Sequence, residues 1–349
     1  MMGPYFTPAA VTGMYSDLMT ETIRHMLERW EVVARQGESL NMDLEMMRLT
    51  MSVIGRTLFS LDLGSELTEV GQAFQEAFAF IPARVLNPLV PLALPLPANR
   101  RFKRNLKRID DFIAAQIDLG RRSPERENLL AVLLKAQDPE SGHVMTDRML
   151  RDEAVILFFA GFETTARSLT WAWYLLSRHA DVMDLLTAES DELLGGRLPV
   201  SADLEKLTYT RMVIDETLRL YPPTAMLSRQ NLEADEIGGY TLPAGSMLSL
   251  CPHVVHRYPD YWPDAERFDP QRFTPQAVAG RPKTAYIPFS AGPRICLGNN
   301  FALMEMVYAF AMAAGRFHMQ RVGEEEIRAT FVGTTRPAVP LVMKPVLRR

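Results

Sequence analysis

A single cysteine in an unusual setting is the first candidate for chemistry. Cys296 lies in FSAGPRICLG, residues 289–298, directly before a long apolar run, and the chain has one other cysteine among its 349 residues. Gly292 and Pro293 predict a tight turn, and the apolar run predicts a helix. The dipole of that helix and the cation of Arg294 would both lower the pKa of the thiol. The pattern therefore predicts a thiolate.

A thiolate can act as a nucleophile, a redox centre or a metal ligand. The six histidines form no recognisable partner motif for a nucleophile, and no second cysteine lies within reach for a redox pair or a zinc site. A single thiolate ligand is characteristic of a haem iron, whose other contacts come from the porphyrin. The segment therefore favours a haem ligand.

Polar residues in the middle of a long apolar segment form a second candidate group. Residues 146–179 predict one helix of about 50 Å, which must be central to the fold. At its middle lies AGFETT, where Gly161 is a poor helix former and Glu163 and Thr164 lie at a buried depth. Two interpretations stay open: a helix kink with a satisfied glutamate, or an acid and alcohol pair that lines a cavity.

A third group lies further along the chain. LEKLTYTRMVIDETLRLYPP predicts a helix that Pro222 and Pro223 end. Glu216 and Arg219 are three residues apart on it and hence share one face. The next segment, EIGGYTLPAGSMLSLCPHVV, predicts a small β-hairpin region, in which Cys251 is expected to be a buried, inert thiol. HRYPDYWPDAERFDPQRFTP then predicts an ordered meander packed against the core.

Taken together, these segments resemble the cytochrome P450 family of haem-thiolate monooxygenases, in its bacterial-type form. FSAGPRICLG is similar to the family's cysteine-loop signature, AGFETT to its oxygen-activation motif, ETLR to its Glu-x-x-Arg motif and DPQRF to its Pro-x-Arg-Phe element. The four motifs occur in the family's order, which makes the resemblance specific. The residues that match the cysteine-loop signature are Phe289, Gly292, Arg294, Cys296 and Gly298.

The resemblance implies haem b, iron protoporphyrin IX, as the cofactor. Cys296 would be the proximal iron ligand, with backbone amides near Gly298 holding the anionic sulfur. Phe289 would shield the thiolate from water. Arg294, and by position Arg229, would pair with the haem propionates.

The same resemblance implies roles on the other side of the haem and behind the loop. Gly161 would open a groove for dioxygen in the central helix. Thr164 would hydrogen-bond the oxygen, and Glu163 would relay protons for its cleavage. The residues Glu216, Arg219 and Arg272 would form a buried ionic triad that fixes the meander.

The elements that position these groups predict a mainly α fold with small β elements, as a single domain over residues 1–349. Helical spacing also covers residues 14–34, 42–62 and 67–81. Residues 86–100 contain four prolines and predict an extended connector. The six Lys or Arg of residues 100–108 predict a solvated helix face, with contact to a membrane surface or an acidic partner as the alternative.

Composition sets further bounds. With 47% hydrophobic residues the chain can bury a large core, and a net charge of −4 gives no reason to expect nucleic acid as a partner. The longest uncharged stretches of the apolar central segment are short, so we expect no transmembrane segment. The two cysteines favour a reducing compartment, and we expect a cytoplasmic protein.

We therefore expect a monooxygenase that inserts one oxygen atom from O2 into a hydrophobic small molecule. By resemblance, electrons would come from a separate ferredoxin or flavoprotein reductase. Fatty acids, terpenoids and steroids all stay open as substrates. The alternatives are a non-catalytic or unstable haem-binding fragment, and a haem-thiolate isomerase or dehydratase.

The start of the chain departs from the family. Family members normally have a further N-terminal segment with helices, strands, and a Trp and Arg that hold a propionate. MMGPYFTPAAVTGMY resembles the stretch just after that arginine. We therefore expect a chain that is N-terminally truncated relative to the family. It would bind haem weakly or not at all, because lost pocket walls and an unpaired propionate cost affinity.

Overall fold

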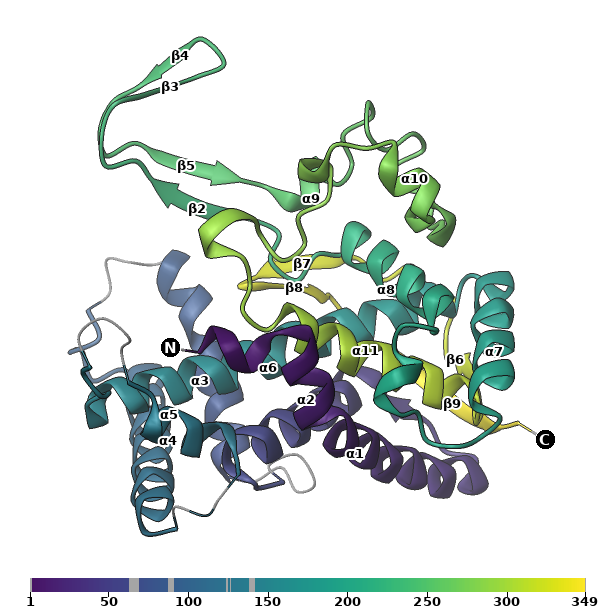
Figure 1. The fold of residues 1–349 in the computed structure, drawn as a ribbon, viewed down its shortest axis with the longest axis horizontal. Coiled ribbons are helices and arrows are strands. Elements are labelled where there is room, and N and C mark those ends of the chain that lie inside the picture. The colour runs from purple at the N-terminus through teal and green to yellow at the C-terminus, as the bar shows by residue number, and fades with distance from the viewer. Residues whose placement is uncertain are drawn as a thin grey trace.

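A helix of 30 residues, α6 (Asp147–Leu176), runs through the middle of the protein (Figure 1). Thr146 caps it by accepting a hydrogen bond from the backbone N–H of Met149. The helix packs against α2 (Met42–Phe59), α4 (Pro97–Arg122) and α8 (Thr208–Leu220), and most of its C-terminal half is buried. The predicted central helix is confirmed, and it ends at Leu176.

The computed structural model describes residues 2–62, 69–86, 91–123, 125, 127–137 and 142–348. Its fold is mainly α with small β elements, as predicted. The other α-helices of the described chain are α1 (Pro8–Gln36), α3 (Glu69–Leu86), α5 (Leu129–Lys135), α7 (Ala180–Leu194), α9 (Pro252–Val255), α10 (Pro275–Ala279) and α11 (Asn299–Ala314). Short 3-10 helices are η1 (Gly3–Phe6), η2 (Ser201–Asp203), η3 (Pro270–Phe273), η4 (Lys283–Ala285) and η5 (Gly292–Arg294).

The strands form small antiparallel sheets around this helical body. One sheet has the order β1 (Leu40–Asn41), β9 (Val342–Leu347) and β6 (Phe317–Arg321). The paired strands are β2 (Leu227–Gln230) with β5 (Met247–Leu250), β3 (Asp235–Ile237) with β4 (Tyr240–Leu242), and β7 (Ala329–Val332) with β8 (Thr334–Pro337). The predicted hairpin region, residues 236–255, contains most of β3 and all of β4 and β5, whereas β2 lies before it. Strands β2 to β5 together project away from the helices (Figure 1).

The hydrophobic core joins elements that are far apart in the sequence. The ring of Trp173 in α6 lies 6.0 Å from that of Trp30 in α1 and 4.7 Å from that of Phe310 in α11. Trp30 and Phe310 are fully buried. Helices α1, α6 and α11 therefore share one packed centre.

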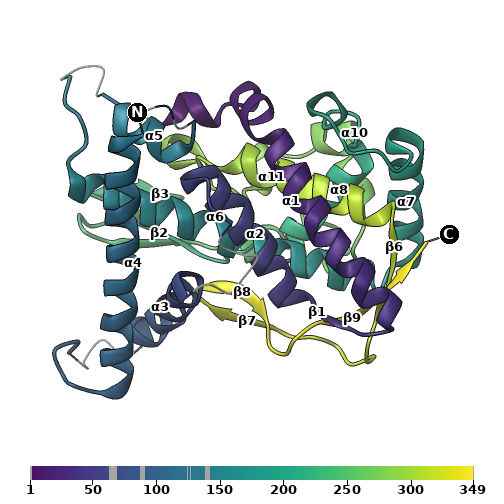
Figure 2. The same cartoon turned by 90° about the horizontal axis from the view of Figure 1, so that it is seen from below.

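The proline-rich connector differs in part from its prediction. Residues 87–90 lie outside the described residues, and residues 91–96 form no helix, as predicted, but Pro97 is the first residue of α4. Proline is tolerated there because the first N–H groups of a helix need no helical partner. Figure 2 shows α4 along one end of the molecule.

The Lys and Arg residues of positions 100–108 are all exposed on α4, and Lys107 pairs with Asp111 at 2.8 Å. This arrangement agrees with the predicted solvated face. No helix in the described ranges is both long enough and apolar enough to cross a membrane.

Candidate active site

A cavity of about 420 Å³ lies between α6, the loop of residues 289–298 and the start of α11. Its walls are mostly apolar. Of the predicted site residues, the cavity brings together Gly161, Thr164, Phe289, Arg294, Cys296 and Gly298. A more open, polar hollow of about 530 Å³ between α1 and α2 contains none of them.

The loop that carries Cys296 is closed by its own backbone. The N–H of Cys296 donates to the carbonyl oxygen of Phe289 at 2.9 Å, and the N–H of Ile295 donates to that of Gly292 at 3.1 Å. Gly292 has φ 69°, which glycine adopts at little cost, whereas Ser290 has φ 64° and is strained. The turn predicted at Gly292 is therefore present, as η5.

The predicted low pKa of the Cys296 thiol is wrong for the protein chain by itself. Cys296 is exposed and lines the cavity, yet desolvation by the surrounding protein raises the pKa of its thiol. The backbone N–H of Gly298, the N-cap of α11, lowers the pKa only in part. The cost of removing a thiolate from water exceeds this help. A thiolate at this position would be favoured by a coordinated metal, which deprotonates its thiol ligand.

The other cysteine, Cys251, is also a free thiol, just before α9. Its Sγ donates to the carbonyl oxygen of Ala225 at 3.2 Å, and the residue is half-buried. The expectation of a buried thiol is therefore met only in part, because Cys251 directly follows the exposed strand β5.

Two cations lie near the loop side of the cavity. Arg294 lines the cavity directly. Arg229, on β2, reaches Ser290 of the cavity wall with its Nη2 at 3.5 Å from Oγ. Both arginines are exposed, so their guanidinium groups can pair with carboxylates of a bound molecule.

On the α6 side, Thr164 and Gly161 line the cavity and the helix is unbroken through both. The Oγ1 of Thr164 donates to the carbonyl oxygen of Ala160 at 2.8 Å. A Cβ added to Gly161 would lie 2.8 Å from Cδ1 and Cγ1 of Ile54 in α2. Gly161 therefore lines the cavity on one side, and its lack of a side chain leaves room for Ile54 on the other.

Glu163 does not lie where its prediction requires. It is 2% exposed and is not among the residues that line the cavity. Its Oε1 accepts from Arg167 Nε at 2.9 Å, from Thr334 Oγ1 at 3.0 Å and from Arg336 Nη2 at 3.1 Å. Arg167 also pairs with Asp43 of α2. The carboxylate is committed to this cluster, so its place does not support the predicted proton relay.

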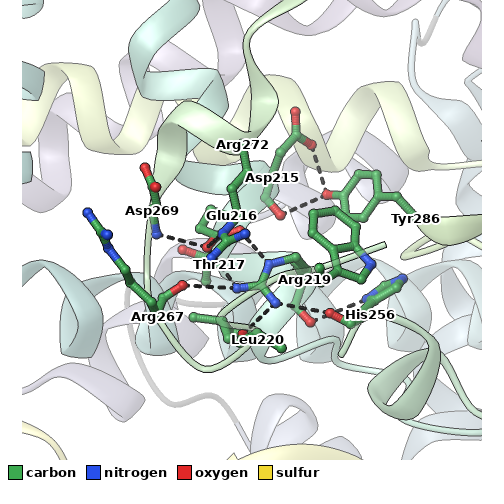
Figure 3. A network of polar contacts seen from close by, with 12 residues as sticks. Asp215, Glu216, Thr217, Arg219, Leu220, His256, Arg267, Asp269, Arg272 and Tyr286 are labelled. Carbon is green, nitrogen blue, oxygen red and sulfur yellow. Dashed lines mark hydrogen bonds and ion pairs between the residues drawn. The ribbon is translucent and has the colours of Figure 1, made fainter. Parts of the chain in front are cut away.

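The three residues of the predicted ionic triad meet in one polar network (Figure 3). Glu216 and Arg219 are fully buried on α8, and Arg219 Nε donates to Glu216 Oε2 at 2.6 Å. Arg272 Nε, in η3, lies 3.6 Å from Glu216 Oε1. Burial raises the pKa of Glu216, and its hydrogen bonds with Arg219 oppose that rise.

The triad holds the meander through backbone groups. Arg219 Nη1 donates to the carbonyl oxygens of His256 and Ala265 at 3.0 and 2.7 Å, and its Nη2 donates to that of Arg267 at 3.2 Å. The backbone N–H of Asp269 donates to Glu216 Oε1 at 2.8 Å. The predicted packing of the meander against the core is therefore present.

Sequence reasoning missed two residues of this network. Tyr286 Oη donates to the carboxylate and lies near the carbonyl oxygen of Asp215, at 3.0 and 2.9 Å (Figure 3). His256 binds the backbone on both sides of its ring. Both residues lie in proline-rich, non-periodic sequence. The one sequence feature that could have pointed to them is that each is a polar aromatic residue in a segment expected to pack against the core.

The groups around the cavity fit a haem. The thiol of Cys296 lies at an apolar cavity and has one backbone N–H donor, that of Gly298. The guanidinium groups of Arg294 and Arg229 lie on the same side of the cavity, where they could pair with the two propionates of a haem. The model of the family described as "Cytochrome P450" matches residues 2–344. The chain belongs to the cytochrome P450 family.

Several relatives are similar to this chain along most of its length. Cyclooctatin synthase of Streptomyces melanosporofaciens is 35% identical over 99% of this chain and 74% of its own length. Cyclooctat-9-en-7-ol 5-monooxygenase of the same organism is 35% identical, over 92% and 70%. Pentalenene oxygenase of Streptomyces avermitilis is 31% identical, over 92% and 71%.

A solved structure agrees with the fold. The crystal structure of the cytochrome P450DA heme domain superposes with a TM-score of 0.92 at 26% identity, covering 100% of this chain and 76% of that one. As a cytochrome P450 the protein is a haem-dependent oxidoreductase of the monooxygenase class. The predicted family, fold class and enzyme class are confirmed.

Proposed function

We propose that this cytochrome P450 binds haem b between α6 and the loop of residues 289–298, and inserts one oxygen atom from O2 into an apolar cyclic molecule. The observation that carries the proposal is the shared cavity, lined by the thiol of Cys296, the hydroxyl of Thr164 and mostly apolar side chains. A thiolate ligand, a proton-bearing group and an apolar binding space are what such a reaction requires of the protein.

The cysteine loop would hold the cofactor. Cys296 would ligate the iron as a thiolate, and the N–H of Gly298 would stabilise the negative sulfur. Thiolate-ligated haem supplies the activation of dioxygen, which amino-acid side chains do not provide. Phe289, on the cavity wall, would keep water from the sulfur. Arg294 and Arg229 would pair with the propionates.

Thr164 would hold a proton at the edge of the reaction space. Its Oγ1 donates to the carbonyl oxygen of Ala160, which fixes the hydroxyl on α6 and leaves its lone pairs open to another donor. Insertion of one oxygen atom consumes O2, two electrons and two protons, and releases water besides the hydroxylated product. A hydroxyl among apolar walls can pass those protons while bulk water stays out.

The substrate would be an apolar cyclic alkene or alkenol of the terpene class. Two relatives are named for cyclooctat-9-en-7-ol and pentalenene. The apolar residues of the cavity, such as Ile156, Leu157 and Leu218, suit such a hydrocarbon skeleton better than a charged molecule. A ferredoxin or flavoprotein reductase would supply the electrons, and the enzyme would work in the cytoplasm.

The first test is the ligand of the iron. The full chain is supplied with haem, reduced and mixed with carbon monoxide, and we expect the Soret band typical of thiolate ligation. Cys296→Ser should abolish that band, and Cys251→Ser should keep it. A wild-type chain without the band would contradict the proposal and favour a non-catalytic fragment.

The second test is the source of the product oxygen. With a reductase system, pentalenene and isotopically labelled O2, we expect one labelled oxygen atom per product molecule. Thr164→Ala should lower product formed per electron consumed by at least about tenfold, and Thr164→Ser should restore much of it. Thr170→Ala should change it little, because Thr170 makes the same kind of hydrogen bond, to the Ala166 carbonyl at 2.9 Å, but does not line the cavity. Product formed without O2 would instead identify an isomerase or dehydratase.

A further inference from the structure

A buried histidine connects α8 with the segment that leads into the cysteine loop. His256 follows α9 and is 0% exposed. Its Nε2 accepts a hydrogen bond from the backbone N–H of Ile287 at 2.9 Å. Its Nδ1 lies 3.3 Å from the carbonyl oxygen of Arg219 (Figure 3). The ring therefore contacts the backbone of two segments that the sequence separates widely.

The two contacts fix which nitrogen carries the proton. The N–H of Ile287 is a donor, so Nε2 must be unprotonated, and Nδ1 must then carry the hydrogen that faces the Arg219 carbonyl. Burial lowers the pKa of His256 to about 3, which agrees with a neutral ring. The backbone carbonyl of His256 also accepts from Arg219 Nη1 at 3.0 Å. Side chain and backbone thus bind the same arginine.

Ile287 is where this connection enters the loop. Its carbonyl oxygen accepts from the N–H of Ser290 at 3.1 Å, and the carbonyl oxygen of Phe289 accepts from the N–H of Cys296 at 2.9 Å. Pro288 and Phe289 line the cavity. The hydrogen bond to His256 therefore fixes the residue from which the closed turn around Cys296 begins.

We propose that His256 is a positioning residue for Cys296: its Nε2 fixes the start of the loop, and through it the place of the thiol in the cavity. The proposal rests on the proposed haem site for its functional meaning. The contacts themselves depend only on residues of this chain. Neither the cysteine-loop signature nor the Glu-x-x-Arg motif includes His256.

A pair of amide substitutions separates the two ring contacts. The shorter side chain in His256→Asn can still donate to the Arg219 carbonyl from a position like that of Nδ1, but it does not reach Ile287. The longer side chain in His256→Gln can place an acceptor near the position of Nε2 and restore the bond to Ile287. Ser190→Ala is the control, because it removes a buried hydrogen bond of similar kind, to the Ala311 carbonyl at 2.6 Å, away from the loop.

The first measurement is made on the cofactor-free full chain in a Cys251→Ser background. It follows the rate at which a thiol reagent modifies Cys296, and the hydrogen exchange of the Ile287 amide. Loss of one buried hydrogen bond should raise both rates by about tenfold in His256→Asn. Ser190→Ala should leave both near wild type, and His256→Gln should return them to within about twofold of it.

The second measurement is the carbon monoxide spectrum of the reduced, haem-loaded chain. His256→Asn should convert part of the thiolate-type band to a band without thiolate ligation, and His256→Gln should restore it. Unchanged modification and exchange rates in His256→Asn would overturn the proposal, as would equal effects of Ser190→Ala. If the wild type lacks the thiolate-type band, the proposed haem site fails, while the modification and exchange rates still decide the role of His256.

Discussion

The carboxylate of Glu163 is the most buried member of a cluster of four charges. Glu163 and Asp43 are negative, and Arg167 and Arg336 are positive, with Thr334 as a further donor. The cluster joins α6 to α2 and β8. Because β8 also binds the loop after α8, through the Thr335 N–H and the Pro223 carbonyl at 2.9 Å, Glu163 contributes to holding a cavity wall.

Glu163→Gln should therefore act first on stability. The substitution leaves the buried Arg167 and the half-buried Arg336 with one carboxylate, that of Asp43. Breaking a buried pair costs about 3 kcal/mol of the free energy of unfolding. Glu153→Gln, on the same helix and only half-buried, should cost less than about 0.5 kcal/mol. Denaturant unfolding of both variants measures the difference. Equal stability of the two would mean that the Glu163 carboxylate does not stabilise this cluster.

The roles of single residues were only partly predictable from the sequence. Cys296 could be found because glycine, proline and arginine surround it within ten residues. The partners of Glu163 could not, since Thr334 and Arg336 lie 171 and 173 residues further along the chain. The direction predicted for the pKa of Cys296 was also wrong. The following helix can be predicted from the sequence, but the desolvation that raises the pKa depends on how the surrounding protein packs.

At the scale of elements, the contact between α2 and α6 passes through Gly161. Alanine there should gain about 1 kcal/mol of helix propensity but clash with Ile54, at a cost of about 1–3 kcal/mol. We expect Gly161→Ala to lower the free energy of unfolding, and Gly13→Ala in α1, where a Cβ meets nothing within 4 Å, to raise it. Combining Gly161→Ala with Ile54→Ala should cost less than the sum of the single changes. Strict additivity would refute the contact.

Helix α11 contains a carboxyl group that is costly to ionise. Glu305 is 0% exposed, and neither of its oxygens has a hydrogen-bond partner among the described residues. Burial raises its pKa well above the ordinary value. The folded chain therefore keeps this proton at a pH where the unfolded chain has lost it. The raised pKa of Glu305 contributes to the free energy of unfolding. This contribution is fully present below the pKa of about 4.3 in the unfolded chain, and it is lost as pH rises through the higher pKa in the folded chain.

Glu305→Gln should remove that decline. The amide has a similar shape and no proton to lose, so the free energy of unfolding should rise near neutral pH and depend less on pH between about 5 and 8. Chemical denaturation across this range measures both effects, with the exposed Glu192→Gln of α7 as the control. A variant that is less stable at every pH would mean that the Glu305 carboxylate has a partner in the native protein.

Most helices were predictable because their signals are local. The spacing of apolar residues indicated α1, α2, α3, α6 and α8, and Pro222 and Pro223 correctly ended α8 at Leu220. The start of α1 at Pro8 and of α4 at Pro97 was missed, because proline was taken as a helix breaker although the first helical turn accepts it.

At the scale of the whole molecule, β2 to β5 form an arm that stands away from the helical body (Figure 1). Leu232 is 92% exposed and Tyr240 78%. The sequence indicated the turn through Gly238 and Gly239, which have positive φ of 59° and 84°. The sequence could not indicate that the arm is exposed. The exposure of a strand depends on which other elements pack against it, and the pattern of residues within the strand does not determine those neighbours.

The arm should open without the rest of the protein. Two-stranded hairpins are marginally stable alone. Besides backbone hydrogen bonds, the Asn231 amide joins the base of β3–β4 by donating to the carbonyl oxygens of Glu233, Leu242 and Pro243 at 2.8, 3.3 and 2.9 Å. Chymotrypsin should therefore cut after Tyr240 faster than after Tyr258, which is 49% exposed.

Asn231→Ala tests whether that amide restrains the arm. Loss of its hydrogen bonds should raise the cutting rate after Tyr240 by about tenfold, while the rate after Tyr258 and the thermal midpoint stay unchanged, because the arm contributes little to the core. Mass spectrometry of a digestion time course, beside a thermal melt, measures all three. If the thermal midpoint falls together with the faster cut, the arm unfolds cooperatively with the helical body, and its exposure does not make it independent.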